Sequence, residues 1–107
     1  MNNLTTQQTE KLEKSIFYWF KQFQNNYVSL HNLIESLTEW ENYLKRKEND
    51  QSKNLWFKFF TGDTEATTIK DIENGLSPRT YTKENRELLN DKIEIALKDN
   101  SLQINFS

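Results

Sequence analysis

The chain has 107 residues, of which 28% are charged and 35% hydrophobic, and its formal net charge is −2. This length fits one domain with one core. The absence of cysteine excludes disulfides, thiolate zinc sites and iron–sulfur clusters, and it favours a reducing compartment. No apolar run reaches the roughly 18 residues of a membrane span, and residues 1–11 lack a signal-peptide pattern. We therefore expect a single cytoplasmic domain, residues 1–107, without a membrane partner.

The first predicted element is a helix over residues 5–24. Thr5 and Gln8 have the spacing of a capping box. Apolar side chains then recur at helical spacing: Leu12, Ile16, Trp19, Phe20 and Phe23. Phe17 and Tyr18 widen the apolar arc beyond one stripe. The run at 16–20 therefore either packs in the core or docks a partner.

A second helix is predicted over residues 29–47, with Ser29 as its N-cap. Its apolar stripe is the most regular in the chain: Leu30, Leu33, Ile34, Leu37, Trp40 and Leu44. We expect one continuous helix, because the stripe continues past a second capping-box spacing at Thr38 and Glu41. The helix ends in a basic cluster, residues 45–47, which is either a solvated face or a partner contact.

Two shorter helices are predicted over residues 52–61 and 64–74. The first carries Leu55, Trp56, Phe59 and Phe60. Gly62 follows it, because glycine most easily adopts the left-handed conformation that ends a helix. Thr64 is the expected cap of the second helix, with Ile69 and Ile72 directed inward. Gly75 is expected to repeat the role of Gly62.

The last predicted helix covers residues 82–98 and is capped by Thr82. Its stripe is Leu89, Ile93, Ala96 and Leu97. The tail after it alternates Leu102, Ile104 and Phe106, which is strand period, but a single short strand has no obvious mate. We expect an extended tail that lies on the core or pairs with another chain. Five helices joined by short turns predict an all-α bundle.

The sequence offers no recognisable chemical site. The single histidine, His31, has no neighbour at the spacing of a metal pair. There is no glycine-rich phosphate loop and no nucleophile in a strand-to-helix glycine context. We therefore expect no catalytic residues, no metal and no cofactor, and a protein that acts by binding.

The predicted order of elements from Leu44 to Leu97 resembles the helix-turn-helix domains of Xre, or lambda-repressor-like, regulators. The resemblance is carried by Leu44, Gln51, Ser52, Leu55, Phe59, Phe60, Gly62, Ile69, Ile72, Glu73, Asn74 and Gly75. It implies a degenerate helix-turn-helix over residues 52–75 that binds duplex DNA. Its implied contacts are Ser52 and Lys53 to phosphate, with Thr64, Glu65, Thr67, Thr68 and Lys70 on the outward face. The sequence departs from the family at Lys58, where the family has a small residue, and in a turn one residue longer.

A second class of function fits the sequence equally well. Small acidic helical proteins without catalytic residues include inhibitors, immunity proteins and antitoxins, often encoded by phages or mobile elements, which block a protein partner. The predicted interface is then Phe17, Tyr18, Lys45, Arg46 and Lys47. Both classes describe a non-enzymatic regulator. The near-neutral outward face predicts weak DNA binding unless a homodimer doubles the contacts.

Overall fold

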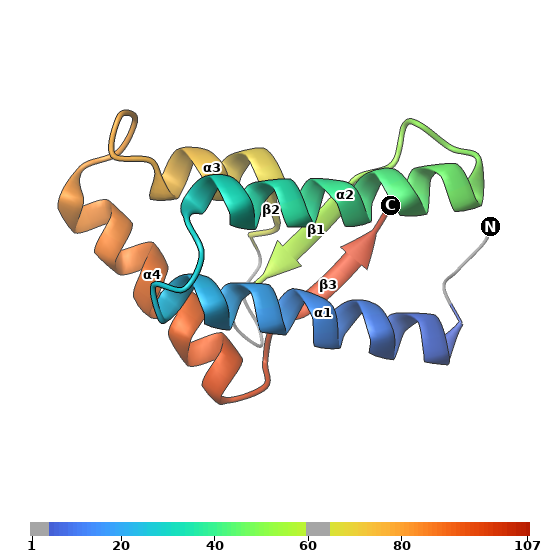
Figure 1. The fold of residues 1–107 in the computed structure, drawn as a ribbon, viewed down its shortest axis with the longest axis horizontal. Coiled ribbons are helices and arrows are strands. Elements are labelled where there is room, and N and C mark those ends of the chain that lie inside the picture. The colour runs from blue at the N-terminus through green and yellow to red at the C-terminus, as the bar shows by residue number, and fades with distance from the viewer. Residues whose placement is uncertain (1–4, 60–64) are drawn as a thin grey trace.

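The computed structural model describes residues 5–59 and 65–107 (Figure 1). Within them the elements are α1 (Thr6–Gln24), α2 (Leu30–Glu48), β1 (Leu55–Lys58), β2 (Thr67–Thr68), α3 (Ile69–Leu76), α4 (Lys83–Lys98) and β3 (Gln103–Phe106). The three strands form one antiparallel sheet in the order β2-β1-β3. The expected all-α bundle of five helices is therefore wrong. The described residues form four helices and a small sheet.

Helices α1 and α2 form an antiparallel hairpin that covers one face of the sheet (Figure 1). Both begin at the predicted caps. The Thr5 hydroxyl accepts the Gln8 N–H at 3.1 Å, and the Gln8 side chain accepts the Thr5 N–H at 3.0 Å. The Ser29 hydroxyl accepts the Asn32 N–H at 3.1 Å. Helix α2 is continuous to Glu48, as expected, and ends on Asn49 in the left-handed conformation.

Strand β1 replaces the helix that was expected over residues 52–61. Leu55, Phe57 and Phe59 are all at most 2% exposed, whereas Trp56 and Lys58 between them are half-buried. Side chains that alternate in this way belong to a strand, because a helix turns residues two apart to opposite sides. The Leu55 N–H donates to the Glu41 carboxylate at 2.8 Å, which fixes the start of the strand against α2.

The C-terminal tail is the mate of β1. Residues 55–58 pair with 103–106 in antiparallel register, with Phe57 opposite Ile104. Asn54 and Ser107 extend the ladder by exchanging both backbone hydrogen bonds, at 2.9 and 3.0 Å. The alternation of Leu102, Ile104 and Phe106 therefore correctly indicated a strand. The partner of that strand is β1 of the same chain, not another chain.

Helix α3 starts later than the helix expected over residues 64–74. Its N-cap is Thr68, whose hydroxyl accepts the Asp71 N–H at 3.1 Å, and Ile69 and Ile72 are buried as expected. The expected Thr64 cap and Gly62 corner lie outside the described residues. Gly75 is not the left-handed residue after the helix, because it is buried inside α3 without a left-handed backbone. Helix α4 begins after the predicted Thr82 cap.

The core fills the space between the helical hairpin and the sheet. The Phe20 ring of α1 meets the edges of Phe57 and Phe59 at centroid distances of 6.0 and 5.9 Å. Helix α4 packs against α1 and α3 and covers the end of the hairpin where α1 stops (Figure 1). Among the described residues, no helix or strand covers the face of the hairpin turned away from the sheet (Figure 1).

Candidate functional site

The two residues predicted to contact DNA phosphate join α2 to the sheet. The Ser52 hydroxyl and N–H both donate to the Asp50 carboxylate, at 2.6 and 2.9 Å. The Lys53 ammonium lies 2.7 Å from the Glu48 carboxylate and 5.7 Å from the centre of the Phe106 ring. Since residues 55–58 form a strand, the first helix of the predicted helix-turn-helix is absent. The helix pair over residues 52–75 was wrong.

The other predicted DNA contacts do not lie on one helix face. Thr67 and Thr68 form β2, where the Thr67 hydroxyl donates to the Phe57 carbonyl at 3.1 Å and Thr68 caps α3. Glu65 is exposed before β2, and Lys70 is exposed in the first turn of α3. Thr64 lies outside the described residues. DNA contact by these residues stays a prediction without the helical surface that motivated it.

The predicted protein interface divides between two places. Phe17 is half-buried and packs against the core, while Tyr18 is 54% exposed. Lys45 lies 3.8 Å from the Glu41 carboxylate on α2. Arg46 and Lys47 are exposed at the end of α2. Of these five residues, Phe17 and Tyr18 line one hollow, and Lys47 lines a separate one between α1 and α2.

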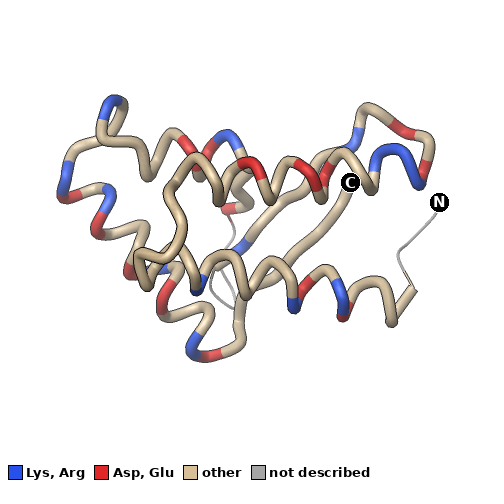
Figure 2. Tube along the Cα trace, viewed as in Figure 1, with Lys and Arg blue, Asp and Glu red and all other residues tan. Residues whose placement is uncertain are grey.

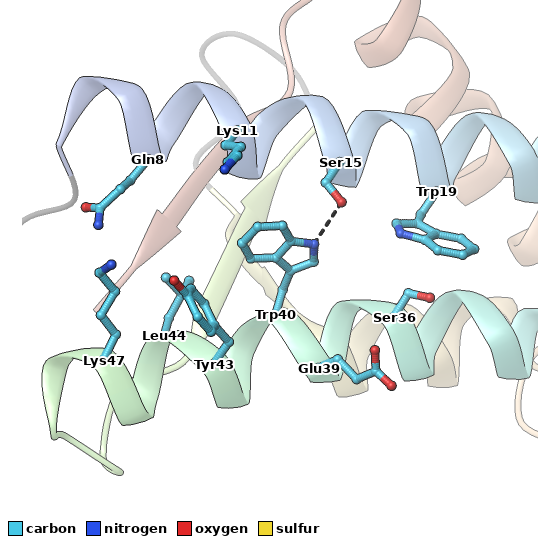
Figure 3. A pocket seen from close by; sticks show the side chains of 10 residues that line it. All are labelled: Gln8, Lys11, Ser15, Trp19, Ser36, Glu39, Trp40, Tyr43, Leu44 and Lys47. Carbon is cyan, nitrogen blue, oxygen red and sulfur yellow. Dashed lines mark hydrogen bonds between the residues drawn. The ribbon is translucent and has the colours of Figure 1, made fainter.

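That hollow is a groove of about 470 Å³ on the open face of the hairpin (Figure 3). We call it the hairpin groove. It is lined from α1 by Gln8, Lys11, Ser15 and Trp19, and from α2 by Ser36, Glu39, Trp40, Tyr43, Leu44 and Lys47. Trp40 reaches across from α2, and its indole N–H donates to the Ser15 hydroxyl at 2.8 Å. This hydrogen bond joins the two walls.

Aromatic side chains make the centre of the hairpin groove. Tyr43 meets Trp40 edge-on at a centroid distance of 5.8 Å, and 45% of Tyr43 is exposed. Trp19 and Trp40 rest against the core and also line the groove. Burying exposed aromatic area is favourable, and rigid rings lose little conformational entropy on binding. The groove is therefore suited to holding an apolar surface.

Three charged side chains line the groove. Lys47 stands with Gln8 at one end, Lys11 stands on the α1 wall across from Tyr43, and Glu39 stands on the α2 wall between Tyr43 and Ser36 (Figure 3). The Lys47 ammonium is 5.7 Å from the centre of the Tyr43 ring, within range of a cation–π contact. The groove thus has an aromatic centre, lysines at one end and on its α1 wall, and a glutamate on its α2 wall.

The described residues group no three side chains that could hold a metal ion. His31 is 83% exposed at 3.7 Å from Glu35, outside the groove. None of the described helices combines the length and apolar character needed to cross a bilayer. The groove offers an apolar contact surface bordered by charged side chains.

Sequence reasoning placed Trp40 in an apolar stripe but missed Tyr43, Lys11 and the groove itself. The available signal was on α2, where Tyr43 stands beside Trp40 of the core stripe. On α1 the lining residues Gln8, Lys11 and Ser15 are polar and gave no such signal. The meaning of the α2 signal depends on how the helices pack, which the stripes alone do not give.

Comparisons with known proteins add no precedent for this groove. No protein-family model, no curated protein and no solved structure matches the chain. The resemblance to Xre-like regulators therefore stays a prediction.

Proposed function

We propose that this protein is a small non-enzymatic regulator or inhibitor that binds another polypeptide through the hairpin groove. The observation that carries the proposal is Tyr43, 45% exposed beside Trp40 in a hollow of about 470 Å³. Tyrosine and tryptophan are enriched among the residues that dominate binding energy at interfaces. Here they stand together on the open face of a helical hairpin.

The composition of the groove supports a protein partner. Its aromatic centre is bordered by Gln8, Lys11, Ser36, Glu39 and Lys47. An apolar centre within a polar border is the usual anatomy of a protein interface. A hollow that runs between two helices also suits an amphipathic helix, which lays its apolar face into such a groove.

A photo-crosslinking experiment tests the proposal. Tyr43 is replaced by p-benzoylphenylalanine, and the protein is irradiated in a lysate of the cells that naturally produce it. We expect a covalent adduct with a polypeptide, identified by mass spectrometry. The control is the same replacement at Tyr27, which is 75% exposed between α1 and α2 and does not line the groove.

The expected result is an adduct at position 43 that position 27 does not give. Because Tyr27 is the more exposed of the two, random collisions would label it at least as strongly. Equal labelling at both positions, or no adduct at position 43, would contradict the proposal.

A further inference from the structure

Three groove residues form a charge pattern along α2. Glu39, Tyr43 and Lys47 are four residues apart, so they lie in one stripe on the helix, and all three are exposed and line the groove. With a rise of 1.5 Å per residue, Glu39 and Lys47 stand roughly 12 Å apart along the axis, with Tyr43 midway. An aromatic centre therefore has opposite charges at equal distances on its two sides.

This pattern is complementary to itself. A two-fold rotation about an axis through Tyr43, perpendicular to α2, brings a second copy of α2 antiparallel to the first. Lys47 of each copy then faces Glu39 of the other, and Tyr43 meets Tyr43. Interfaces that close a symmetric dimer have this property, because each patch must bind its own copy.

The wider charge distribution of α2 has the same polarity (Figure 2). Its middle carries the exposed Glu35 and Glu39, whereas its last turn carries the basic cluster 45–47. Lys11 of α1 stands across the groove from Tyr43, at the centre of the pattern (Figure 3), so it adds nothing to this polarity. With an antiparallel second copy, the basic end of each α2 helix faces the acidic middle of the other. With a parallel copy, charges of the same sign would face each other.

We infer that the occupant of the hairpin groove is a second copy of this chain, bound antiparallel as a two-fold dimer. The inference rests on the proposed function, because it names the polypeptide that the same groove binds. Helices of 19 residues are roughly 28 Å long and about 10 Å in diameter. Two of them side by side present a face of roughly 560 Å², which is the extent of a small interface that buries less than about 1,200 Å² in total.

Charge reversal tests the inference with the full chain. Sedimentation velocity over a wide range of concentrations gives the dimer dissociation constant for the natural sequence, Lys47→Glu, Glu39→Lys and the double variant. Each single reversal puts like charges together twice in the dimer, so we expect dissociation constants raised about tenfold or more. The double variant restores opposite charges at both contacts, and we expect it to return to within about threefold of the natural value.

Lys98→Glu is the matched control, because Lys98 is exposed on α4 away from the groove. It changes the net charge as much as Lys47→Glu does and should leave the dimer unchanged. Circular dichroism and thermal unfolding of each variant show that the fold is kept. A protein that stays monomeric at all concentrations, or a dimer that the single reversals do not weaken, overturns the inference.

The two experiments together distinguish a failure of the dimer from a failure of the proposed function. If the chain is monomeric and the crosslinker at position 43 captures a different protein, the groove binds a polypeptide and the self-association is wrong. If the crosslinker captures neither the chain itself nor another protein, both proposals fail. An adduct of twice the chain mass together with the rescue by the double variant supports the dimer, and it supports the proposed function only in that the groove binds a polypeptide.

Discussion

Two aromatic runs of similar composition adopt opposite structures in this protein. In residues 16–20 of α1, the buried side chains are Ile16 and Phe20, four apart, and Tyr18 midway between them is 54% exposed. In residues 55–59, the side chains of Leu55, Phe57 and Phe59 are all at most 2% exposed, two apart. One run has the period of a helix and the other that of a strand, although both are dense in apolar residues.

The difference lies in what surrounds each run. Residues 16–20 lie within a 19-residue helix that has a complete capping box and a stripe that begins at Leu12. Residues 55–59 follow the polar residues 49–54. Five residues are too few to show a clear helical or strand period. Short apolar runs do not distinguish a helix from a strand by periodicity alone. The second run becomes a strand because β3 supplies the backbone partner that a lone strand lacks.

The two runs should differ most in how much stability their middle residues contribute. Phe57→Ala should destabilise the protein by about 3–5 kcal/mol, since it removes a buried ring that packs against Phe20 and Phe59. Tyr18→Ala should cost less than about 1 kcal/mol, because that ring is largely exposed. Urea unfolding measures both. Similar losses at the two positions would show that residues 55–59 do not alternate as a strand.

Local signals in the sequence were enough for the helical part of the fold. The caps Thr5, Ser29 and Thr82 and the stripes that follow them correctly predicted α1, α2 and α4. The sheet needed information that is not local. The tail had a visible strand period, but its mate had been assigned to a helix, so the pairing of Phe57 with Ile104 could not be found. The hairpin groove likewise depends on the packing of α1 on α2.

Lys53 lies in the segment that joins α2 to β1. Lys53→Ala should destabilise the protein by about 2–3 kcal/mol, because the Glu48 side chain is 3% exposed and would keep a buried charge without the Lys53 ammonium. The matched control is Lys58→Ala in β1, which is half-buried and should cost less. Thermal unfolding measures both. A Lys53→Ala protein as stable as the natural one would mean that the ammonium does not stabilise the junction.

Thr68, predicted as a DNA contact, has a capping role that a stability measurement can test. As the N-cap of α3, Thr68 accepts the Asp71 N–H, so Thr68→Ala should cost about 1 kcal/mol. Lys70→Ala in the same turn should change stability by less than about 0.5 kcal/mol, because its side chain is exposed. Urea unfolding of the two variants measures the difference. Equal stabilities would remove the capping role.

A smaller effect is expected at Gly75, where sequence and structure disagree. A left-handed residue would make Gly75→Ala destabilising by about 1–2 kcal/mol. Inside α3, alanine instead gains up to about 1 kcal/mol of helix propensity. Its methyl group would stand 2.6 Å from the Leu89 Cδ2 atom, the end of a half-buried side chain that can turn aside. We therefore expect a net change within about 0.5 kcal/mol of zero by thermal unfolding, and a clear destabilisation would mean that the Leu89 side chain does not make room for the methyl group.

The smallest expected effect is on the pKa of Asp50, which lies between α2 and β1. The Ser52 hydroxyl and N–H, both bonded to the Asp50 carboxylate, hold the pKa of Asp50 below its usual range. A carboxyl whose pKa is lower in the folded state stabilises the fold above its unfolded pKa, near about 4. That contribution is lost as the pH falls through the folded pKa.

Carbon NMR titration of the Asp50 carboxyl should show a higher midpoint in Ser52→Ala than in the natural protein, because the hydroxyl is the largest cause of the shift. The remaining N–H keeps part of the shift, so the midpoint should stay below that of an unfolded aspartate. An unchanged midpoint in Ser52→Ala would mean that the hydroxyl does not hold the turn through which the helical chain enters β1.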